Sequence, residues 1–292
     1  MSRQVKNIIA ITVFLICIGL INVAGQNIEI EIRGMNAFTF ILIIAVLLQV
    51  IFFIPSFLLK TEKYYDLVGS LTYITTVSLA YFSVENKTMI DSVIYFYVMV
   101  WALRLGIYLF RRVRNDGKDV RFEKAKRHFF WFLQYWMGQA LWVSLTACAA
   151  IIAILSAEED TLPVLAIVGM VLWISGFTIE SISDYQKRVF RKENNPSESF
   201  IHTGFWARSR HPNYFGEITL WTGIAVIALN TLNGIEYVTL ISPVFVYILL
   251  TRMSGVNLLE RIADDRYGHL KEYHRYKRNT PVLVPKLFND KL

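Results

Sequence analysis

The residues best suited to chemistry form a short basic cluster, Arg208, Arg210 and His211. Pro212 follows directly, and an apolar stretch begins at Tyr214. Proline is favoured in the first turn of a helix, because a backbone N–H is not needed there. The free N–H groups and the positive dipole end of that helix would then face the basic cluster. Such an arrangement binds anions, so the pattern predicts a phosphate or carboxylate site.

The same apolar stretch carries two further polar side chains, Asn213 and Glu217. It has the composition of a membrane span, in which an unpaired carboxylate is costly, so Glu217 is expected to face a polar cavity. Basic residues beside a span also act as orientation signals or contact lipid headgroups. This alternative applies to the whole basic cluster.

A second group of charges continues the preceding apolar stretch. Asp184, Lys187, Arg188 and Arg191 lie three, four or seven residues apart, and therefore share one helix face. In the functional interpretation, Asp184 orients cations that hold a phosphate. Ordinary ion pairing along the helix is the alternative, and it stabilises only slightly. Arg104, inside another apolar stretch, either contacts a bound anion or extends to the membrane surface.

Two amphipathic stretches, 260–268 and 272–281, follow the last apolar stretch and are rich in arginine and tyrosine. Such stretches lie passively along membrane surfaces. Their side chains also suit a cap that covers a nucleotide. The residues expected to contribute to it are Arg266, Tyr267, Tyr273 and Tyr276.

Asp66 opens a different apolar stretch and follows Tyr65. A carboxylate beside tyrosines at a span entrance can serve as an interfacial anchor. It can also share protons with a substrate carbonyl, which is acid–base chemistry.

Membrane-spanning helices must position these residues. The chain has 292 residues, of which 54% are hydrophobic and 14% aromatic, and this is too apolar for an ordinary soluble domain. Several stretches approach the roughly 20 residues that a transmembrane helix needs. They are Ile8–Ala24, Ala37–Leu59, Leu67–Phe82, Ile90–Phe110, Phe130–Leu155, Leu162–Ile179, Tyr214–Leu229 and Tyr237–Thr251. The predicted fold is all-α, a polytopic bundle of about seven to eight spans.

Charge alternates between these stretches. Basic residues precede the first span and fill the loop after the fourth, whereas the acidic run Glu158–Asp160 follows the fifth. The positive-inside rule then places both termini in the cytoplasm, at the inner membrane of a prokaryote or the endoplasmic reticulum of a eukaryote. It also explains the net charge of +7, so no nucleic-acid partner is expected. The first span fits the alternation, although Arg3, Lys6 and the following apolar residues also suit a cleaved signal peptide.

Several common sites are excluded. The two cysteines, Cys17 and Cys148, lie in apolar stretches and provide neither a disulfide framework nor a zinc set. The histidines form no His-Glu-x-x-His pair, so no metal is expected. The glycines form no Gly-x-Gly-x-x-Gly, so a nucleotide would not be bound by a Rossmann turn.

Three motifs together resemble the steroid 5-alpha-reductase-like integral membrane family, in particular its prokaryotic-type branch (DUF1295-type). They are Trp101-Ala-Leu-Arg-Leu-Gly106, Asp184-Tyr-Gln-Lys187 with Arg191, and Ser209-Arg-His-Pro-Asn-Tyr-Phe-Gly-Glu217 with Trp221. The resemblance extends over residues 61–285. Part of the third motif, Arg-His-Pro-x-Tyr, is shared with isoprenylcysteine methyltransferases.

The resemblance implies a bundle of about seven helices that binds NADPH from the cytoplasm and a flat apolar substrate between helices. By motif, the residues that match cofactor ligands are Asp184, Arg191, Asn213, Tyr214 and Glu217. Arg208, Arg210 and His211 fall near the same anion. The first span would be an addition to the core, which divides the chain into 1–35 and a membrane domain with a cytoplasmic tail, 36–292.

One position departs from the family pattern. In the steroid reductases, a tyrosine three residues before the arginine that matches Arg104 helps a glutamate polarise the substrate ketone. Trp101 stands there in this chain, and an indole supplies no phenolic proton. Tyr97, one helical turn earlier, is the expected substitute, and Asp66 lies near the place of the glutamate.

The leading hypothesis is an oxidoreductase that reduces a C=C bond with NADPH in a lipid-like or steroid-like molecule. Asp66, with Tyr97 or Tyr65, would hydrogen-bond the substrate carbonyl and stabilise the developing enolate. One alternative is an S-adenosylmethionine-dependent membrane methyltransferase of the isoprenylcysteine type. The other is a non-catalytic lipid-binding membrane protein. The expected partners are the lipid-like substrate and membrane lipids.

Overall fold

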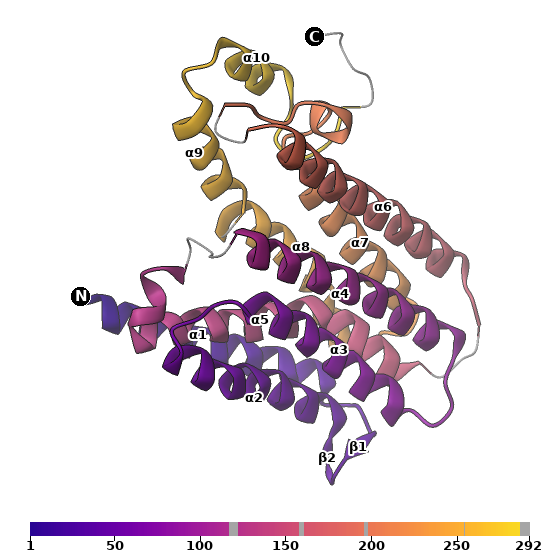
Figure 1. Cartoon of the computed structure of the whole chain (residues 1–292). Helices are drawn as coiled ribbons and strands as arrows, with labels where there is room; N and C mark the ends of the chain where they lie inside the picture. The colour runs from indigo at the N-terminus through magenta and orange to yellow at the C-terminus, as the bar shows by residue number, and fades with distance from the viewer. Residues whose placement is uncertain (117–121, 158–160, 196–197, 254, 287–292) are drawn as a thin grey trace. The chain divides into compact units, whose positions relative to one another are not determined.

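The computed structural model describes residues 1–116, 122–157, 161–195, 198–253 and 255–286. The chain divides into two compact units, and each is built mainly from helices (Figure 1). The first unit is Met1–Ala166 with Ala225–Ser242, and the second is Ile167–Ile224 with Pro243–Leu292. The acidic run Glu158–Asp160 lies outside the described residues.

One central helix organises the first unit. The elements of this unit are α1 (Arg3–Ile21), β1 (Glu31–Ile32), β2 (Met35–Asn36), α2 (Ala37–Leu58), α3 (Tyr65–Ser83), α4 (Met89–Asp116) and α5 (Phe129–Ser156). Helices α1, α2, α3 and α4 all pack against α5 (Figure 1). In the most apolar part of α5, 83% of the residues are buried, as expected for a helix that is hydrophobic on all sides. Helix α1 packs against α5 as the other helices do. The division of the chain into an added segment, 1–35, and a membrane domain, 36–292, therefore stays a prediction.

The strands β1 and β2 form a short antiparallel hairpin between α1 and α2, with Glu31 opposite Asn36 and Ile32 opposite Met35. Arg33 and Gly34, the two turn residues, have φ of 54° and 75°. Positive φ at both central positions is typical of tight hairpin turns.

The outer faces of the first unit are apolar. Large hydrophobic side chains such as Leu20 on α1, Ile51 on α2 and Phe96 on α4 are more than half exposed. Apolar patches of this kind rarely face water, and lipid contact explains them. Polar groups lie inside instead, where the amide of Gln49 donates to the hydroxyl of Thr72 over 2.8 Å. The unit has the apolar exterior of a membrane protein.

Within the described residues, six helical stretches are long and apolar enough to cross a membrane. They are Arg3–Gly25, Ala37–Leu58, Met89–Arg111, Phe129–Ser156, Val164–Glu193 and Gly234–Tyr267. The other two predicted spans are helices α3 and α7 (Pro212–Ala228). Helix α7 has only 17 residues, and α3 carries Asp66 and several hydroxyl side chains, which lower its hydropathy. The predicted all-α, polytopic membrane fold is confirmed.

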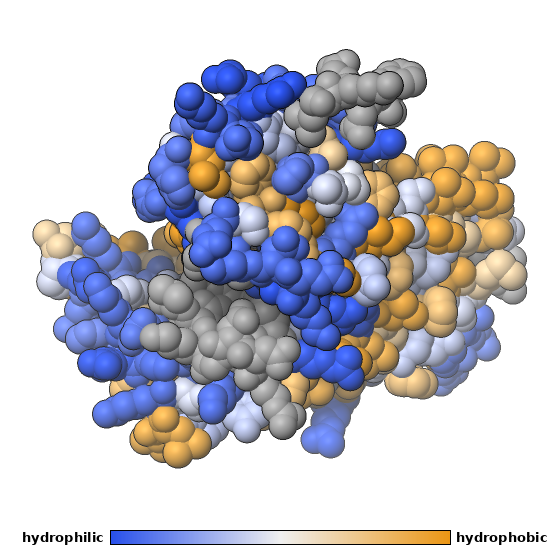
Figure 2. All heavy atoms as spheres, turned by 45° about the horizontal axis from the view of Figure 1, so that its top comes forward, coloured by the Kyte–Doolittle hydropathy of each residue, from blue (hydrophilic) through white to orange (hydrophobic). Residues whose placement is uncertain are grey.

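The second unit contains most of α6, α7 and α8 together with α9 and α10. Its helices are α6 (Val164–Glu193), α7, α8 (Ile241–Ile248), α9 (Val256–Tyr267) and α10 (Lys271–Asn279), with a π-helical turn, Leu249–Met253, after α8. The two amphipathic stretches predicted beyond the last span are α9 and α10. Figure 2 shows hydrophilic side chains gathered over this end of the unit, where Lys271, Glu272, Arg275 and Arg278 are exposed.

Glycines bring α6 and α7 into direct backbone contact. A Cβ added to Gly216 would lie 2.6 Å from the backbone nitrogen of Glu180 and the carbonyl oxygen of Gly176. One added to Gly223 would lie 2.6 Å from the carbonyl oxygen of Gly169. In both helices the glycines recur at a spacing of seven, close to two turns, so they stay on one face. We call this contact the glycine seam, and it fixes α6 against α7.

Candidate functional site

The second unit contains a cavity of about 170 Å³ between α6, the loop that precedes α7, α9 and α10. The predicted cofactor-binding residues in its wall are Lys187, Arg191, Arg210, His211, Arg266, Tyr267, Tyr273 and Tyr276. Pockets that enclose a whole ligand usually measure roughly 300–1,000 Å³. The cavity therefore suits one part of a larger ligand, such as a phosphate group and the sugar beside it.

The loop before α7 is anchored on α6. Gly204 has φ of +60°, and a side chain there would overlap the amide of Gln186. Without one, the backbone N–H of Phe205 donates to Gln186 Oε1 over 3.0 Å. The indole N–H of Trp206 donates to the carbonyl oxygen of Ser183 over 3.1 Å. Glycine is needed here because both positive φ and close approach are required.

The segment after α10, residues 281–286, holds the other side of this loop, and we call it the strap. The backbone N–H of Arg210 donates to the carbonyl oxygen of Pro281 over 2.9 Å, and that of Lys286 donates to Arg208 over 3.0 Å. These two bonds join the loop and the strap like neighbouring strands. Both arginines of the basic cluster therefore have their backbone positions set by the strap.

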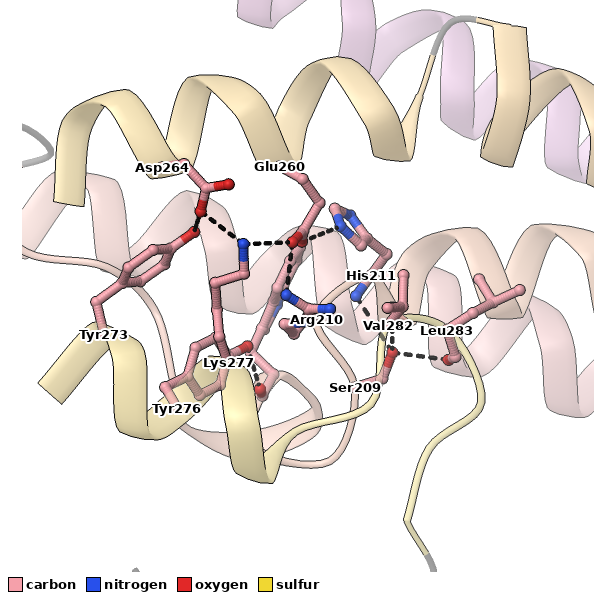
Figure 3. A network of polar contacts seen from close by, with 11 residues as sticks. Ser209, Arg210, His211, Glu260, Asp264, Tyr273, Tyr276, Lys277, Val282 and Leu283 are labelled. Atoms are coloured by element: carbon pink, nitrogen blue, oxygen red, sulfur yellow. Dashed lines mark hydrogen bonds and ion pairs between the residues drawn. The ribbon is translucent and has the colours of Figure 1, made fainter. Parts of the chain in front are cut away.

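Ser209 lies between these backbone bonds and is completely buried. Its hydroxyl donates to the carbonyl oxygen of Leu283 over 2.7 Å, and it accepts the backbone N–H of His211 over 3.2 Å (Figure 3). This role of Ser209 was not predicted, because serine is common in loops and turns. Ser209 connects the strap to the first residue before α7.

A carboxylate from α9 lies at the centre of the polar contacts in Figure 3. Glu260 Oε2 contacts Arg210 Nη1 at 2.5 Å and Lys277 Nζ at 3.3 Å, and its Oε1 contacts His211 Nε2 at 2.9 Å. Lys277 also contacts Asp264 at 2.6 Å. Neither Glu260 nor Lys277 was predicted as a site residue, since charges on an amphipathic helix usually form a solvated face.

Burial has the largest effect on the pKa of His211. It lowers the pKa of the imidazole below 6.5, although the hydrogen bond and negative charge of Glu260 oppose this effect. His211 is therefore neutral at neutral pH. A carboxylate only accepts hydrogen bonds, so Nε2 carries the proton in this contact. The ring stacks on Tyr214 with centroids 5.6 Å apart.

Two tyrosines in the cavity wall, Tyr273 and Tyr276, act as hydrogen-bond donors. Tyr276 donates to the carbonyl oxygen of Trp206 over 2.7 Å, and Tyr273 donates to Asp264 over 3.0 Å. Burial raises the pKa of both phenols, and the nearby Asp264 carboxylate raises that of Tyr273 further. Their rings surround Phe200, with centroids 5.3 Å away in each case. The site thus joins an aromatic surface to a group of cations.

The other predicted cofactor residues of this unit lie outside the cavity wall. Asn213 donates to the carboxylate of Asp184 over 3.3 Å across the glycine seam. Asp184 and Glu217 are almost completely buried, whereas Arg208 is exposed.

Arg104 and the three predicted catalytic residues belong to the first unit. The Tyr65 hydroxyl donates to the carbonyl oxygen of Tyr135 over 2.9 Å, and the ring is buried. Asp66 lies in the first turn of α3, and Tyr97 is half-buried within α4.

The pairing of α3 with α4 separates Asp66 from Tyr97. The hydroxyls of Ser78 and Tyr95 lie 3.4 Å apart, so Tyr97 is nearly level with Ser78. Asp66 precedes Ser78 by twelve residues, which is roughly 18 Å along a helix. One substrate carbonyl therefore cannot contact both side chains.

Trp101 is buried, and its ring meets that of Tyr73 edge-on with centroids 5.0 Å apart. Tyr73, from α3, is also buried. Sequence reasoning did not choose Tyr73 as catalytic, because the contact depends on how α3 and α4 align. A phenol thus lies directly beside the indole.

The fold and these motifs define a mainly helical integral membrane protein of the steroid 5-alpha-reductase-like type. The profile of the family described as "Protein of unknown function (DUF1295)" matches residues 52–280, and the chain belongs to this family.

Individual relatives are more distant. The chain is 25% identical over 122 residues to 3-oxo-5-alpha-steroid 4-dehydrogenase 1 of Macaca fascicularis and 24% identical over 122 residues to that of Homo sapiens. It is 26% identical over 117 residues to the Mus musculus protein. The matches cover 42%, 42% and 40% of this chain and span only 41%, 42% and 40% of the length of the relatives. No solved structure gives a significant match.

Proposed function

We propose that this protein is an integral-membrane, NADPH-dependent reductase of a C=C bond in a lipid-like or steroid-like substrate. The charge of the cavity in the second unit carries the proposal. Lys187, Arg191, Arg210 and Arg266 contribute four positive charges to its wall, and Glu260 contributes one negative charge. NADPH has a pyrophosphate and a further phosphate of about −1.5 to −2 charge, so a cationic cavity suits it.

The same charge weighs against the methyltransferase alternative. S-adenosylmethionine carries a sulfonium and an ammonium group and only one carboxylate. An excess of arginine and lysine in the wall would repel its positive centres. A passive lipid-binding protein, in turn, needs no cationic cavity flanked by aromatic rings.

The residues present fit a dinucleotide chemically. The guanidinium of an arginine such as Arg191 or Arg266 can donate to two oxygens of one phosphate at once. Phe200 and the tyrosines around it offer ring faces and edges for a base or nicotinamide. The cofactor would supply a hydride when bound.

The substrate class follows from the names of the relatives. They are named for a 3-oxo-5-alpha-steroid, and a 4-dehydrogenation is the reverse of reducing a C=C bond conjugated to that oxo group. We therefore propose a flat, apolar substrate with a carbonyl next to the double bond. Its carbonyl oxygen must receive a hydrogen bond as negative charge develops on it.

Asp66, Tyr97 and Tyr65 remain the proposed carbonyl donors, with Tyr73 added by its place beside Trp101. A carboxyl group donates only when protonated, so Asp66 would need a raised pKa or a proton from a neighbouring phenol. Tyr97 lies one turn before Trp101 on α4, whereas Tyr73 lies beside Trp101 itself.

Equilibrium binding to the purified protein tests the cofactor directly. NADPH is expected to bind and S-adenosylmethionine is not. Arg266→Gln, in the cavity wall, should weaken NADPH binding by about tenfold or more, because a charged hydrogen bond is lost. Arg261→Gln removes the same charge from a position of α9 that does not line the cavity, and serves as the control. Binding of S-adenosylmethionine alone would instead support the methyltransferase.

We propose that the cavity opens to the cytoplasm. Arg208 and Asn233 are both exposed and flank α7. Single cysteines introduced at these positions should react with an impermeant reagent from opposite sides of the membrane. Reaction of both from one side would contradict this topology.

A further inference from the structure

We infer that Glu260 is an internal counter-ion: its carboxylate occupies the anion position of the cavity and thereby sets the affinity for phosphate groups. The identity of the physiological ligand as a dinucleotide rests on the proposed function. The role of the carboxylate does not, because it concerns any phosphate-bearing anion that enters the cavity.

The contacts of Glu260 are those of a bound anion. Three nitrogen donors, from Arg210, His211 and Lys277, meet the two oxygens of one carboxylate (Figure 3). The donors come from the loop before α7 and from α10, whereas the carboxylate comes from α9. Convergent N–H donors are the usual way in which proteins bind carboxylates and phosphates.

The position is also poorly solvated. The exposed fractions of the side chains are 20% for Glu260, 12% for Arg210 and 7% for His211. Charges act more strongly on one another where water is largely excluded. Glu260 is the only acidic side chain among the described residues of the cavity wall. An entering phosphate would therefore meet one negative charge, and it would compete with that charge for Arg210.

The helices around Glu260 have a second connection. Asp264, one turn further along α9, contacts Lys277 at 2.6 Å and accepts the hydroxyl of Tyr273 over 3.0 Å. These contacts tie α9 to α10 without Glu260. A neutral residue at position 260 should therefore leave the two helices in place.

Glu260→Gln tests the inference, since it keeps the length of the side chain and one oxygen acceptor for Arg210 while removing the charge. Inorganic pyrophosphate should then bind about tenfold more tightly, and orthophosphate should gain less. The repulsion between the Glu260 carboxylate and a ligand scales with the charge of the ligand. Removing the carboxylate should therefore favour pyrophosphate more than orthophosphate. NADPH should also bind more tightly.

The measurement is a calorimetric titration of the full chain, solubilised in nonionic detergent, with pyrophosphate, orthophosphate and NADPH. Asp265→Asn is the matched control, because Asp265 is exposed on the same helix and does not line the cavity. It should change the dissociation constants by less than about twofold, since exposed charges are screened by salt. If Glu260→Gln does not fold, Glu260→Met provides an uncharged side chain of similar length.

Unchanged or weaker pyrophosphate binding in the folded Glu260 variant would overturn the inference, as would an equal gain in Asp265→Asn. Tighter pyrophosphate binding supports it. If pyrophosphate binding tightens while NADPH binds to none of the proteins, the counter-ion stands and the proposed function is rejected.

Discussion

The side-chain amide of Asn213 donates to the carboxylate of Asp184 over 3.3 Å. The two residues lie on α7 and α6, beside the glycine seam that holds these helices together. Both were predicted as cofactor ligands from motifs that are far apart in the chain. Their contact means that a ligand touching one of them would also depend on the other.

A double-mutant cycle tests this dependence. Asp184→Ala and Asn213→Ala should each weaken NADPH binding at least about tenfold, since a lost charged hydrogen bond costs roughly 1.5–3 kcal/mol. The double variant should lose less than the sum, because neighbouring residues couple. Equilibrium titration measures all four affinities. Unchanged binding in both single variants would leave Asp184 and Asn213 with a purely structural role.

The glycine seam predicts a large effect from a small substitution. Gly216→Ala places a methyl group 2.6 Å from backbone atoms of α6, which cannot move without separating the helices. The melting temperature and the NADPH affinity should both fall, although alanine is the better helix former by about 1 kcal/mol. Gly19→Ala in α1, where a Cβ would meet nothing within 4 Å, should be neutral or slightly stabilising. Equal melting temperatures for the two variants would contradict the seam.

The carbonyl site is tested by turnover with a 3-oxo steroid that has a conjugated double bond. If Asp66 is the donor, Asp66→Ala should lower turnover by roughly 10²-fold while NADPH affinity stays nearly intact. Tyr97→Phe or Tyr73→Phe should do so if the donor is a phenol near Trp101. Because Asp66 and Tyr97 lie at different levels of α3 and α4, only one of them should show the loss. Full activity in all three variants would reject this site and leave the cofactor assignment standing.

Tyr65→Phe is expected to behave differently from Tyr97→Phe. The Tyr65 hydroxyl already donates to a buried backbone carbonyl, so its removal should lower the free energy of unfolding by about 1 kcal/mol or more. Turnover of the folded enzyme should change less than in Tyr97→Phe. Thermal melts and initial rates separate the two effects, and a larger loss of turnover in Tyr65→Phe would reverse the assignment.

Hydropathy and length predicted most helices closely, because they are local properties. The stretch expected at Phe130–Leu155 is α5, Phe129–Ser156, and the helical spacing of Asp184 and Arg191 correctly extended α6 beyond its apolar part. The glycine seam was not predicted. The seven-residue spacing of its glycines is visible in the sequence, but only the pairing of two helices gives that spacing a meaning.

Many residues of the cavity wall had been named from the sequence, because arginines and tyrosines are grouped in short segments of the chain, which is again a local property. Glu260 was missed, because its contact with Arg210 joins residues 50 positions apart. The separation of Asp66 from Tyr97 depends on the alignment of α3 with α4, which no single segment encodes.

The pH dependence of stability should contain a contribution from His211. Its pKa is lowered below 6.5 by burial, so between that lowered value and 6.5 the unfolded chain binds more protons than the folded protein. The free energy of unfolding is therefore highest above this window and falls as the pH decreases through it. His211→Gln can still contact Glu260 but does not titrate, so its melting temperature should fall less between about pH 7 and about pH 5. Identical slopes in the two proteins would contradict the prediction.

Ser209→Ala should loosen the strap. It removes the donor to Leu283 and the acceptor for the His211 N–H, at a cost of about 1–3 kcal/mol for buried groups left without a partner. Limited proteolysis near residue 286 should become faster. Ser181→Ala is a suitable control, because the buried Ser181 hydroxyl has no hydrogen-bond partner among the described residues. Equal proteolysis rates in the two variants would show that the serine does not secure the strap.

The strap also imposes an order on biosynthesis. Leu283 emerges from the ribosome 74 residues after Ser209, a delay of roughly 4–15 s at usual rates of translation. During that interval α6 and α7 can already associate through their glycines, while the arginine-rich loop lacks its backbone partners. The loop that carries Arg208 and Arg210 is therefore among the last parts of the protein to become ordered, and the helices of a new chain would enter the membrane before this loop has its backbone partners.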